Sequence, residues 1–454
     1  MSRVALIGEN SIEYISNLLD IWNHGDCAVL LDWRIPIHTA IEMMNEANVH
    51  KCYIERRFID NINTTIPTHI EFVTFERLSN SAEILPEYIY KKFKDNYGKE
   101  EAVVIYSSGT TGKAKGVILS HFAIHTNADS IISYMKPTPQ DCLYMVKTIS
   151  HASSLVGELL VALKSKAKIV IAPIIVPPRY TMTNISKYKA TIMCINPTLL
   201  QMYMDEYSRR KDKYDISSLK QMYVHGAKAN IRCCESAAQL FATCSVYYEY
   251  GLTEAGPRVT TQRISSKSID SAGKPIENVQ VKIMNQNKKE VAKNEYGMIH
   301  VKTPSIYMGY IFGNSKFESL CEGWLNTGDI GYFDAFEELH IVGRADDVII
   351  INAHKIYPSE IERQILEYTS VKECAVAKVD INGNEFIGCL YASEEKIEYD
   401  IKEKLRTRLL PYEIPRFFLR CNEMPRTNNG KISISEAKAY LKKYINWEPR
   451  NEQR

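Results

Sequence analysis

The chain has little excess charge of either sign and no long hydrophobic run. Lys and Arg number 56 against 54 Asp and Glu, so a bulk polyanion such as nucleic acid is not an expected partner. The longest strongly apolar stretch, residues 169–176, is interrupted by Pro173 and is far shorter than the roughly 20 residues that span a bilayer. The first residues, MSRVALIGEN, lack the cationic segment and apolar core of a secretory signal. We therefore expect a cytoplasmic protein that binds neither nucleic acid nor membrane.

The cysteines lack the spacing of a disulfide framework or a metal site. Their number, 11, is odd, and the close pair Cys233 and Cys234 is adjacent rather than spaced as C-x-x-C. Reduced and mostly buried thiols are the expectation.

The segment SSGTTGKAKGV, residues 107–117, carries the clearest chemical pattern. Its glycines alternate with hydroxyl and lysine side chains, which suits a backbone that bends around phosphate oxygens and donates N–H groups to them. The apolar runs AVVIY and VILSH flank it, so the loop is predicted to join two strands. Because the loop G-x-x-x-x-G-K-[ST] precedes a helix instead, a kinase or GTPase is disfavoured. A flexible turn is the alternative for the loop alone.

Alternating strand and helix patterns predict a layered α/β fold. VALIG, a helix pattern over residues 12–22 and CAVLLD form a βαβ opening. The same alternation recurs through residues 168–250, which predicts largely parallel strands.

The pattern changes toward the end of the chain. From about Asp270 it indicates short strands with turns, and later a small α+β unit with a helix near Pro358 and a hairpin at Asn382-Gly383. A chain of 454 residues is too long for one core. We expect a large domain over residues 1–345, built of α/β subdomains and a small β-rich part, and a mobile small domain over residues 346–454.

The segment EYGLTEAG combines an aromatic ring, a hydroxyl and a carboxylate. Tyr250 can stack on a base, Thr253 can donate to a phosphate, and Glu254 offers the hard oxygen that Mg²⁺ prefers. A strand that ends in a glycine turn and an N-capping threonine explain the segment about as well.

Two later segments place single charged residues in polar turns. In GWLNTGDIG, Asp329 can accept two hydroxyl hydrogen bonds, as a ribose requires, although an Asx turn is the alternative. In PRTNNGKIS, Lys431 follows Gly430, and a solvated turn lysine is the usual fate of such a residue.

Taken in order, these segments resemble the motifs of the adenylate-forming superfamily, which includes acyl- and aryl-CoA ligases, carrier-loading adenylation enzymes and luciferases. Residues 107–117 resemble its phosphate loop, with Ala114 where proline is usual. YGLTE matches its Y-G-x-T-E element, Asp329 its ribose-binding aspartate, and residues 425–433 its catalytic-lysine loop. The resemblance covers nearly the whole chain.

The resemblance implies ATP-dependent activation of a carboxylic acid as acyl-AMP, with release of pyrophosphate and transfer to a thiol of CoA or of a phosphopantetheine carrier protein acting in trans. It implies ATP and Mg²⁺ as cofactors. Catalytic roles fall to Lys431, Glu254, Thr253 and His151, with Glu254 as the magnesium ligand and Asp346 as the hinge. The resemblance implies that the nucleotide is bound by Ser107, Ser108, Gly109, Thr110, Thr111, Gly112, Lys113, Gly226, Ala227, Lys228, Tyr250, Gly251, Asp329 and Arg344.

The sequence narrows the acid only in part. ISHASSLVG has His151 where amino-acid-activating relatives usually carry an aspartate for the substrate ammonium. This favours an aryl or acyl acid, and a packed core histidine is the alternative. An amino-acid-activating enzyme and a non-catalytic nucleotide-binding protein of the same fold stay open.

Two departures from the family pattern bear on the acceptor and the substrate wall. Ala353 stands where the family typically has glycine near the pantetheine arm, which puts free CoA in doubt more than adenylation. The chain also begins later than is usual, which is expected to alter the dimer surface or the wall around the acid.

Overall fold

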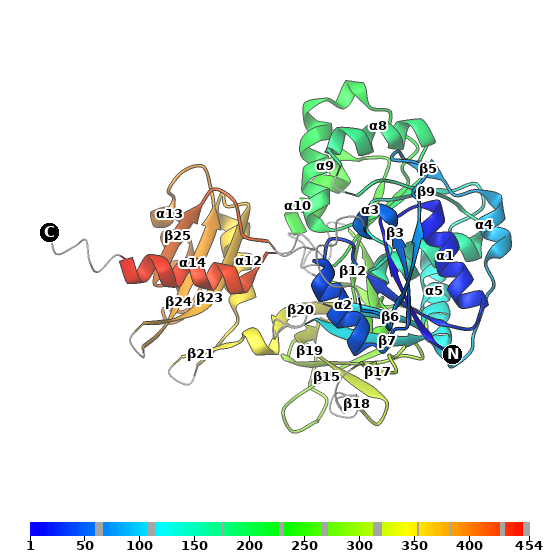
Figure 1. Ribbon diagram of the computed structural model, residues 1–454. Coiled ribbons are helices and arrows are strands. Elements are labelled where there is room, and N and C mark those ends of the chain that lie inside the picture. Colours follow the sequence, from blue (N-terminus) through cyan, green and yellow to red (C-terminus); the bar gives the residue numbers. More distant parts are fainter. Residues whose placement is uncertain are drawn as a thin grey trace. The chain divides into compact units, whose positions relative to one another are not determined.

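The chain folds into two compact units (Figure 1). The large unit comprises Met1–Lys282, His300–Thr327 and Glu337–Leu339, and the small unit comprises Ile283–Ile299, Gly328–Phe336 and His340–Arg454. The predicted boundary between residues 345 and 346 stays a prediction. The computed structural model describes residues 1–59, 67–107, 114–174, 176–226, 231–264, 271–311, 320–351, 354–381, 384–426 and 432–447.

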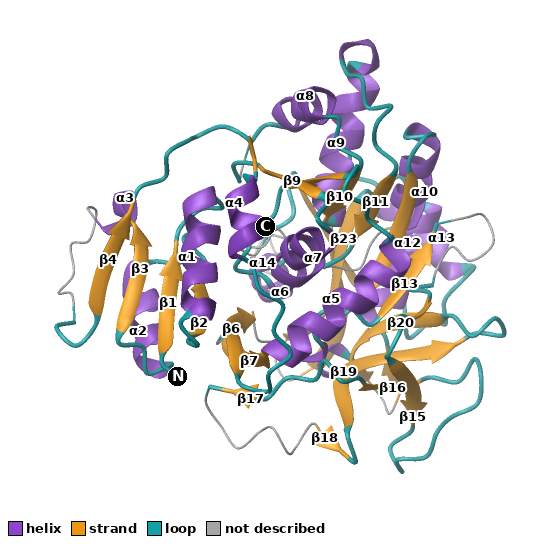
Figure 2. Cartoon of the chain, turned by 90° about the vertical axis from the view of Figure 1, so that its right-hand side faces the viewer, coloured by secondary structure: helices purple, strands orange, loops and turns teal. Residues whose placement is uncertain are grey.

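The first sheet of the large unit is parallel at its centre. Its order is β17-β7-β6-β2-β1-β3-β4, and β6, β2, β1, β3 and β4 run parallel, while β7 is antiparallel to β6 and β17 is antiparallel to β7. Figure 2 shows β4, β3, β1 and β2 side by side. The bounds are β1 (Arg3–Ile7), β2 (Cys27–Leu31), β3 (Lys51–Glu55), β4 (Glu71–Phe75), β6 (Glu101–Ser107), β7 (Lys115–Ser120) and β17 (Gly309–Tyr310).

Helices cover this sheet because its strands are apolar on both faces. Every residue of β2 is buried, as expected for a parallel strand with layers on both sides. Ala5 and Val29 share a core cluster with Ala40 and Met44 of the second helix, while the alternate residue Leu6 is buried toward the other face. The bounds are α1 (Ile12–Asn23), α2 (Ile37–Glu46), α3 (Arg56–Ile59), α4 (Glu87–Lys92) and α5 (His121–Met135).

The second sheet has the order β14-β13-β12-β11-β10-β8-β9-β5. Strands β12, β11, β10, β8 and β9 are parallel. At the edges, β13 pairs antiparallel with β12, β14 with β13, and β5 with β9. The predicted α/β class with largely parallel central strands is thus confirmed. The bounds are β5 (Glu83–Ile84), β8 (Cys142–Met145), β9 (Lys168–Ile171), β10 (Ile192–Ile195), β11 (Gln221–Val224), β12 (Ser245–Tyr250), β13 (Thr260–Arg263) and β14 (Lys274–Pro275).

The helices around the second sheet include one with a π-helical middle. This helix consists of α6 (Ala152–Ser154), the π segment η1 (Leu155–Leu160) and α7 (Val161–Ser165). The other helical segments are α8 (Pro178–Tyr188), α9 (Pro197–Arg209), η2 (Lys211–Lys213), α10 (Ile231–Leu240) and η3 (Thr253–Ala255). No helix among the described residues is long and apolar enough to cross a membrane.

Short strands follow, as the sequence predicts from about Asp270. The third sheet has the order β15-β16-β19-β18, and β20 pairs with β19. The bounds are β15 (Gln280–Met284), β16 (Gly297–Lys302), β18 (Leu320–Cys321), β19 (Trp324–Phe333) and β20 (Leu339–Arg344).

The rest of the small unit is a three-stranded sheet with helices on both faces. Strands β23 (Glu373–Ile381) and β24 (Asn384–Ala392) are antiparallel with Ile381 opposite Asn384, which confirms the predicted hairpin, and β25 (Phe417–Cys421) runs parallel to β24. Side chains alternate between the faces. Val376 packs with α12 (Pro358–Tyr368) and α13 (Glu398–Arg406), whereas Ala377 packs with α14 (Ile434–Trp447). Segment η4 (Ala345–Asp347) and the pair β21 (Ile349–Ile351) and β22 (His354–Ile356) come before them.

Candidate active site

The predicted site residues of the large unit lie at the ends of strands. Ser107 is the last residue of β6, Gly226 follows β11, and Tyr250 is the last residue of β12. The loop after Ser107 joins β6 to β7, as predicted. The carboxyl ends of parallel strands are where open α/β sheets bind ligands, so the second sheet brings Gly226 and Tyr250 to one edge.

Several predicted residues lie outside the described part of the chain. They are Ser108, Gly109, Thr110, Thr111, Gly112, Lys113, Ala227, Lys228, Lys431 and Ala353.

Glu254 is fixed by the edge strand β17 and the residues just before it. The Tyr310 hydroxyl donates a 2.9 Å hydrogen bond to Glu254 Oε1, and the Tyr307 N–H donates 3.0 Å to the Glu254 carbonyl. Tyr310 lies in β17, opposite Val117 of β7. Burial, together with the neighbouring Glu254, raises the pKa of Tyr310, so its hydroxyl keeps the proton that it donates. The glutamate is partly exposed and therefore accessible to a cation.

The turn before Glu254 requires glycine. A Cβ at Gly251 would lie 1.8 Å from the Pro257 carbonyl oxygen, so no other residue fits without moving the backbone. The N-cap residue of η3 is Leu252, without a side-chain cap. The alternative explanation of Thr253 as an N-cap is therefore wrong.

His151 faces a carboxylate that the sequence analysis did not single out. It precedes α6, its ring is 29% exposed, and Nε2 lies 3.8 Å from Asp32 Oδ2. Burial raises the pKa of Asp32, but hydrogen bonds from Arg34 and the nearby His151 outweigh it and leave that pKa below its usual value. Arg34 Nε donates 2.8 Å to Asp32 Oδ1. Asp32 and Arg34 directly follow the apolar run of residues 27–31, and charged residues at the end of a predicted parallel strand were the signal that could have identified them.

Asn10 holds the loop that leads to His151. Its Nδ2 donates 2.7 Å to the Lys147 carbonyl, and its Oδ1 accepts 2.9 Å from the Ile149 N–H. Asn10 is buried beyond the end of β1, so the first sheet fixes a loop of the second.

A chain of polar contacts, which we call the buried charge network, lies at the same edge of the second sheet. Lys147 Nζ is 3.1 Å from Glu158 Oε1 and 2.7 Å from His225 Nε2. Arg258 Nη2 is also 2.7 Å from His225 Nε2, and Arg258 Nε donates 2.7 Å to Glu249 Oε2. Lys147 has the most accessible side chain of the two ion pairs, at 12% exposed, against 2% for Glu158, 4% for Arg258 and 1% for Glu249.

The surrounding structure is fitted to this network. Asn127 donates 3.0 Å to the Arg258 carbonyl and accepts 3.1 Å from its N–H, and the Tyr134 hydroxyl donates to Glu249. A Cβ at Gly157 in η1 would lie 2.9 Å from Arg258 Nη2. Glu158 is carried by the same π-helical segment, a local irregularity that is frequent at functional sites.

In the small unit, the two residues assigned to the ribose lie together. Arg344 Nη1 donates 3.1 Å to Asp329 Oδ1, and Asp329 is buried at 8% exposed. Gly328 has φ +74°, and a Cβ there would lie 2.7 Å from Arg344 Nη2. Asp346 lies in η4, directly after β20. Its role as a hinge stays a prediction.

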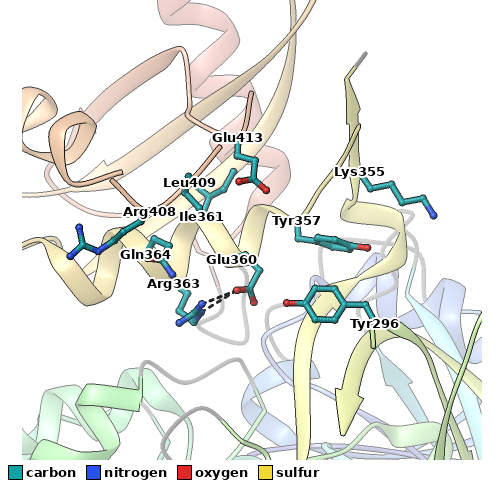
Figure 3. A pocket seen from close by; sticks show the side chains of 10 residues that line it. All are labelled: Tyr296, Lys355, Tyr357, Glu360, Ile361, Arg363, Gln364, Arg408, Leu409 and Glu413. Atoms are coloured by element: carbon teal, nitrogen blue, oxygen red, sulfur yellow. Dashed lines mark hydrogen bonds and ion pairs between the residues drawn. The ribbon is translucent and has the colours of Figure 1, made fainter. Parts of the chain in front are cut away.

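The small unit also has a pocket that no predicted site residue lines (Figure 3). Its volume is about 320 Å³. The Tyr296 and Tyr357 rings lie 5.5 Å apart, and Arg363 forms an ion pair with Glu360 at 3.0 Å. Since both signs of charge line this pocket, it does not point to one class of ligand.

Comparison with known proteins identifies relatives of both parts of the chain. Residues 1–311 match the AMP-binding enzyme family, and residues 360–431 match the AMP-binding enzyme C-terminal domain. The 2-succinylbenzoate--CoA ligase of Enterococcus faecalis is 25% identical over 443 residues, which cover 95% of this chain and 87% of that protein.

Solved structures share the fold over nearly the full length. ATP-bound MatB from Rhodopseudomonas palustris superposes with a TM-score of 0.83 at 21% identity, covering 98% of this chain and 89% of that one. The O-succinylbenzoate coenzyme A synthetase MenE of Bacillus subtilis, in complex with ATP and magnesium ion, gives 0.79 at 22% identity, covering 97% and 89%.

Proposed function

The chain belongs to the AMP-binding enzyme family, and on this premise we propose that it activates a carboxylic acid with ATP and transfers the acyl group to CoA. The observation that carries the proposal is the Tyr310–Glu254 contact. It holds a carboxylate of the family motif against β17, the edge strand that pairs with β7, which the phosphate-loop segment leads into. Relatives named as CoA ligases for 2-succinylbenzoate and 4-coumarate support the reaction class.

The reaction needs a leaving group, because a carboxylate resists nucleophilic attack. A carboxylate oxygen of the acid bonds to the α-phosphorus of ATP while the bond to pyrophosphate breaks. The thiol sulfur of CoA then bonds to the acyl carbon, AMP leaves, and the thiol proton is released. The protein has to position both partners and offset the negative charge that gathers on the phosphates.

The described residues fit a magnesium ion that is held mainly by substrate oxygens. Mg²⁺ at phosphate sites is commonly bound through one or two carboxylates and the phosphates, and it would neutralise phosphate charge there. Glu254 is partly exposed and presents one carboxylate, of which Tyr310 occupies Oε1. Among the described residues no cluster of three or more His, Cys, Asp or Glu could hold a metal by itself.

The remaining assignments follow the family motifs and are proposed for this chain. Asp329 and Arg344 bind the ribose, Tyr250 stacks on the base, and Lys431 contacts the acyl and phosphate oxygens. Rotation about Asp346 withdraws Lys431 before the thiol attacks. Retention of these residue types favours an enzyme over a protein that binds ATP without turnover.

Pyrophosphate release with a panel of aryl, acyl and amino acids tests the proposal. Release that depends on both ATP and one class of acid is expected, and Lys431→Ala should lower the rate by about 10²-fold or more. Lys438→Ala, at an exposed position of α14, is the matched control. If ATP binds and no acid gives release above background, the enzyme proposal fails.

The acceptor is tested separately by chasing the acyl-AMP. CoA should discharge it and yield an acyl thioester. Discharge by a phosphopantetheinylated carrier protein alone would instead point to loading of a carrier in trans.

A further inference from the structure

The buried charge network has no role in the proposed nucleotide chemistry. Burying ions is costly, and apolar side chains of similar size usually stabilise a protein as well or better. Lys147, Glu158, Glu249 and Arg258 are nevertheless enclosed at the sheet edge. Charged groups retained at such a cost, in a place where ligands bind, point to recognition.

The network lies next to the candidate site. Lys147 comes four residues before His151, His225 directly precedes Gly226, and Arg258 comes four residues after Glu254. Lys147 and His225 follow the carboxyl ends of β8 and β11, and Arg258 lies between η3 and β13. The network therefore lies at the strand ends where the proposed site residues Gly226 and Tyr250 also lie.

The central histidine contacts both cations of the network. Lys147 Nζ and Arg258 Nη2 both lie 2.7 Å from His225 Nε2. A lysine ammonium and an arginine guanidinium can only donate, and an imidazole nitrogen has one lone pair, so the two cations converge on a single acceptor. His225 therefore brings Lys147 and Arg258 together without a carboxylate between them.

Glu158 is the acidic partner of Lys147, at 3.1 Å. Burial raises its pKa, although the nearby Lys147 counteracts this effect. The Lys147 side chain is 12% exposed and that of Glu158 is 2% exposed. Within this pair the cation is therefore the group that an additional carboxylate can reach.

We propose that the acid activated by this protein is a dicarboxylic acid, and that Lys147, backed by His225 and Arg258, binds the carboxylate that is not activated. This inference rests on the proposed function. Lys147 makes the direct contact because its side chain is the most accessible of the network's ion-paired groups. Arg258 is enclosed by Glu249, Asn127 and His225 and holds the network in place.

Matched pairs of acids test the proposal on the full-length protein. Pyrophosphate release is measured with hexanoate against hexanedioate and with benzoate against terephthalate and 2-succinylbenzoate. We expect at least one diacid to exceed its monoacid by about 10²-fold in kcat/KM, because a polar site rejects a ligand that leaves its groups unpaired. If monoacids match or exceed diacids in every pair, the inference is overturned.

Substitution of Lys147 separates recognition from a structural role. Lys147→Met should lower the ratio of diacid to monoacid kcat/KM by about 10²-fold, mainly through the KM of the diacid, and Lys147→Arg should recover most of it. Lys168→Met, at an exposed position of β9 in the same sheet, should leave the ratio unchanged. Equal losses for both acids in Lys147→Met would assign Lys147 a structural role and overturn the proposal.

Two controls keep the outcomes distinct. ATP binding and thermal unfolding verify that each variant folds. If Lys147→Met does not fold, the comparison of monoacids with diacids in the wild-type protein decides whether the substrate is a dicarboxylic acid. Absence of pyrophosphate release with every acid, while ATP binds, is the failure of the proposed function itself and removes this inference with it.

Discussion

The Tyr310 hydroxyl donates a 2.9 Å hydrogen bond to the Glu254 carboxylate across 56 positions of sequence. Tyr310 belongs to the short edge strand β17, which pairs with β7. The carboxylate proposed to hold magnesium is thereby oriented from the edge strand that pairs with the strand after the proposed phosphate loop. A ligand oriented by a second residue depends on that residue for its affinity.

Tyr310→Phe should therefore weaken magnesium binding without preventing folding. The phenyl ring keeps the packing and removes the hydroxyl donor. We expect the Mg²⁺ concentration for half-maximal pyrophosphate release to rise by about 10-fold, the lower end of typical effects of such residues. Tyr88→Phe, at an exposed position, is the control. An unchanged magnesium dependence would mean that Tyr310 does not orient the ligand.

A comparison of two glycines isolates the Arg344–Asp329 contact. Gly328 and Gly323 have φ +74° and +80°, so alanine at either position costs about 1 kcal/mol of backbone strain. Only at Gly328 would the new Cβ press on Arg344, 2.7 Å from Nη2; at Gly323 the nearest atom is 3.7 Å away.

Gly328→Ala should raise the KM for ATP by about 10-fold, because it displaces a group proposed to bind the ribose, a loss of about 1.4 kcal/mol. Gly323→Ala should share the loss of stability and leave the KM for ATP unchanged. Steady-state kinetics and urea unfolding of both variants provide the measurement. Equal KM values would show that Arg344 does not contact the nucleotide.

The sequence predicts the sheets well because burial leaves a local pattern. The apolar run of residues 27–31 is buried throughout, as parallel central strands require. Asn382-Gly383 predicts the hairpin between β23 and β24 because few residue pairs suit a two-residue turn. Each prediction needs only neighbours in the chain.

The candidate site is only partly predictable because its partners are distant in sequence. The motifs predict Glu254, Asp329 and Arg344 as site residues, and in the structure the last two are in contact. The contact between Lys147 and His225 joins positions 78 apart, and its presence depends on the order of strands in the second sheet. No local spacing encodes that order.

The stability of the protein should depend on pH through Glu158. Lys147, Arg258 and Cys194 are the ionisable groups that interact with it from neighbouring elements. Because burial raises its pKa in the folded protein, folding favours its protonated form. Protonated Glu158 therefore contributes to the free energy of unfolding. This contribution is complete below the ordinary pKa of a glutamate, about 4.3, and is lost as pH rises through the higher pKa of the folded state.

Glu158→Gln should remove this dependence. The difference in free energy of unfolding, wild type minus variant, is expected to fall as pH rises from about 4 toward neutrality. Urea unfolding at a series of pH values measures it. A difference that stays constant or grows with pH would mean that ionised Glu158 is favoured by its cationic neighbours.

A double-mutant cycle should give a large coupling energy for the buried Glu249–Arg258 ion pair. The side chains are 1% and 4% exposed and joined at 2.7 Å. Glu249→Met or Arg258→Met alone leaves one buried charge without its partner and should cost about 3 to 5 kcal/mol in free energy of unfolding. The double variant removes both charges and should cost far less than the sum.

The exposed pair Arg56–Glu76, with side chains 53% and 60% exposed, is the matched comparison. Its single variants should each cost less than about 1 kcal/mol, because water solvates the charge that remains. Urea unfolding of both cycles gives the two coupling energies. If the Glu249 and Arg258 losses simply add, the ion pair does not compensate for the burial of its charges, and the network must be held by Tyr134, Asn127 and His225 instead.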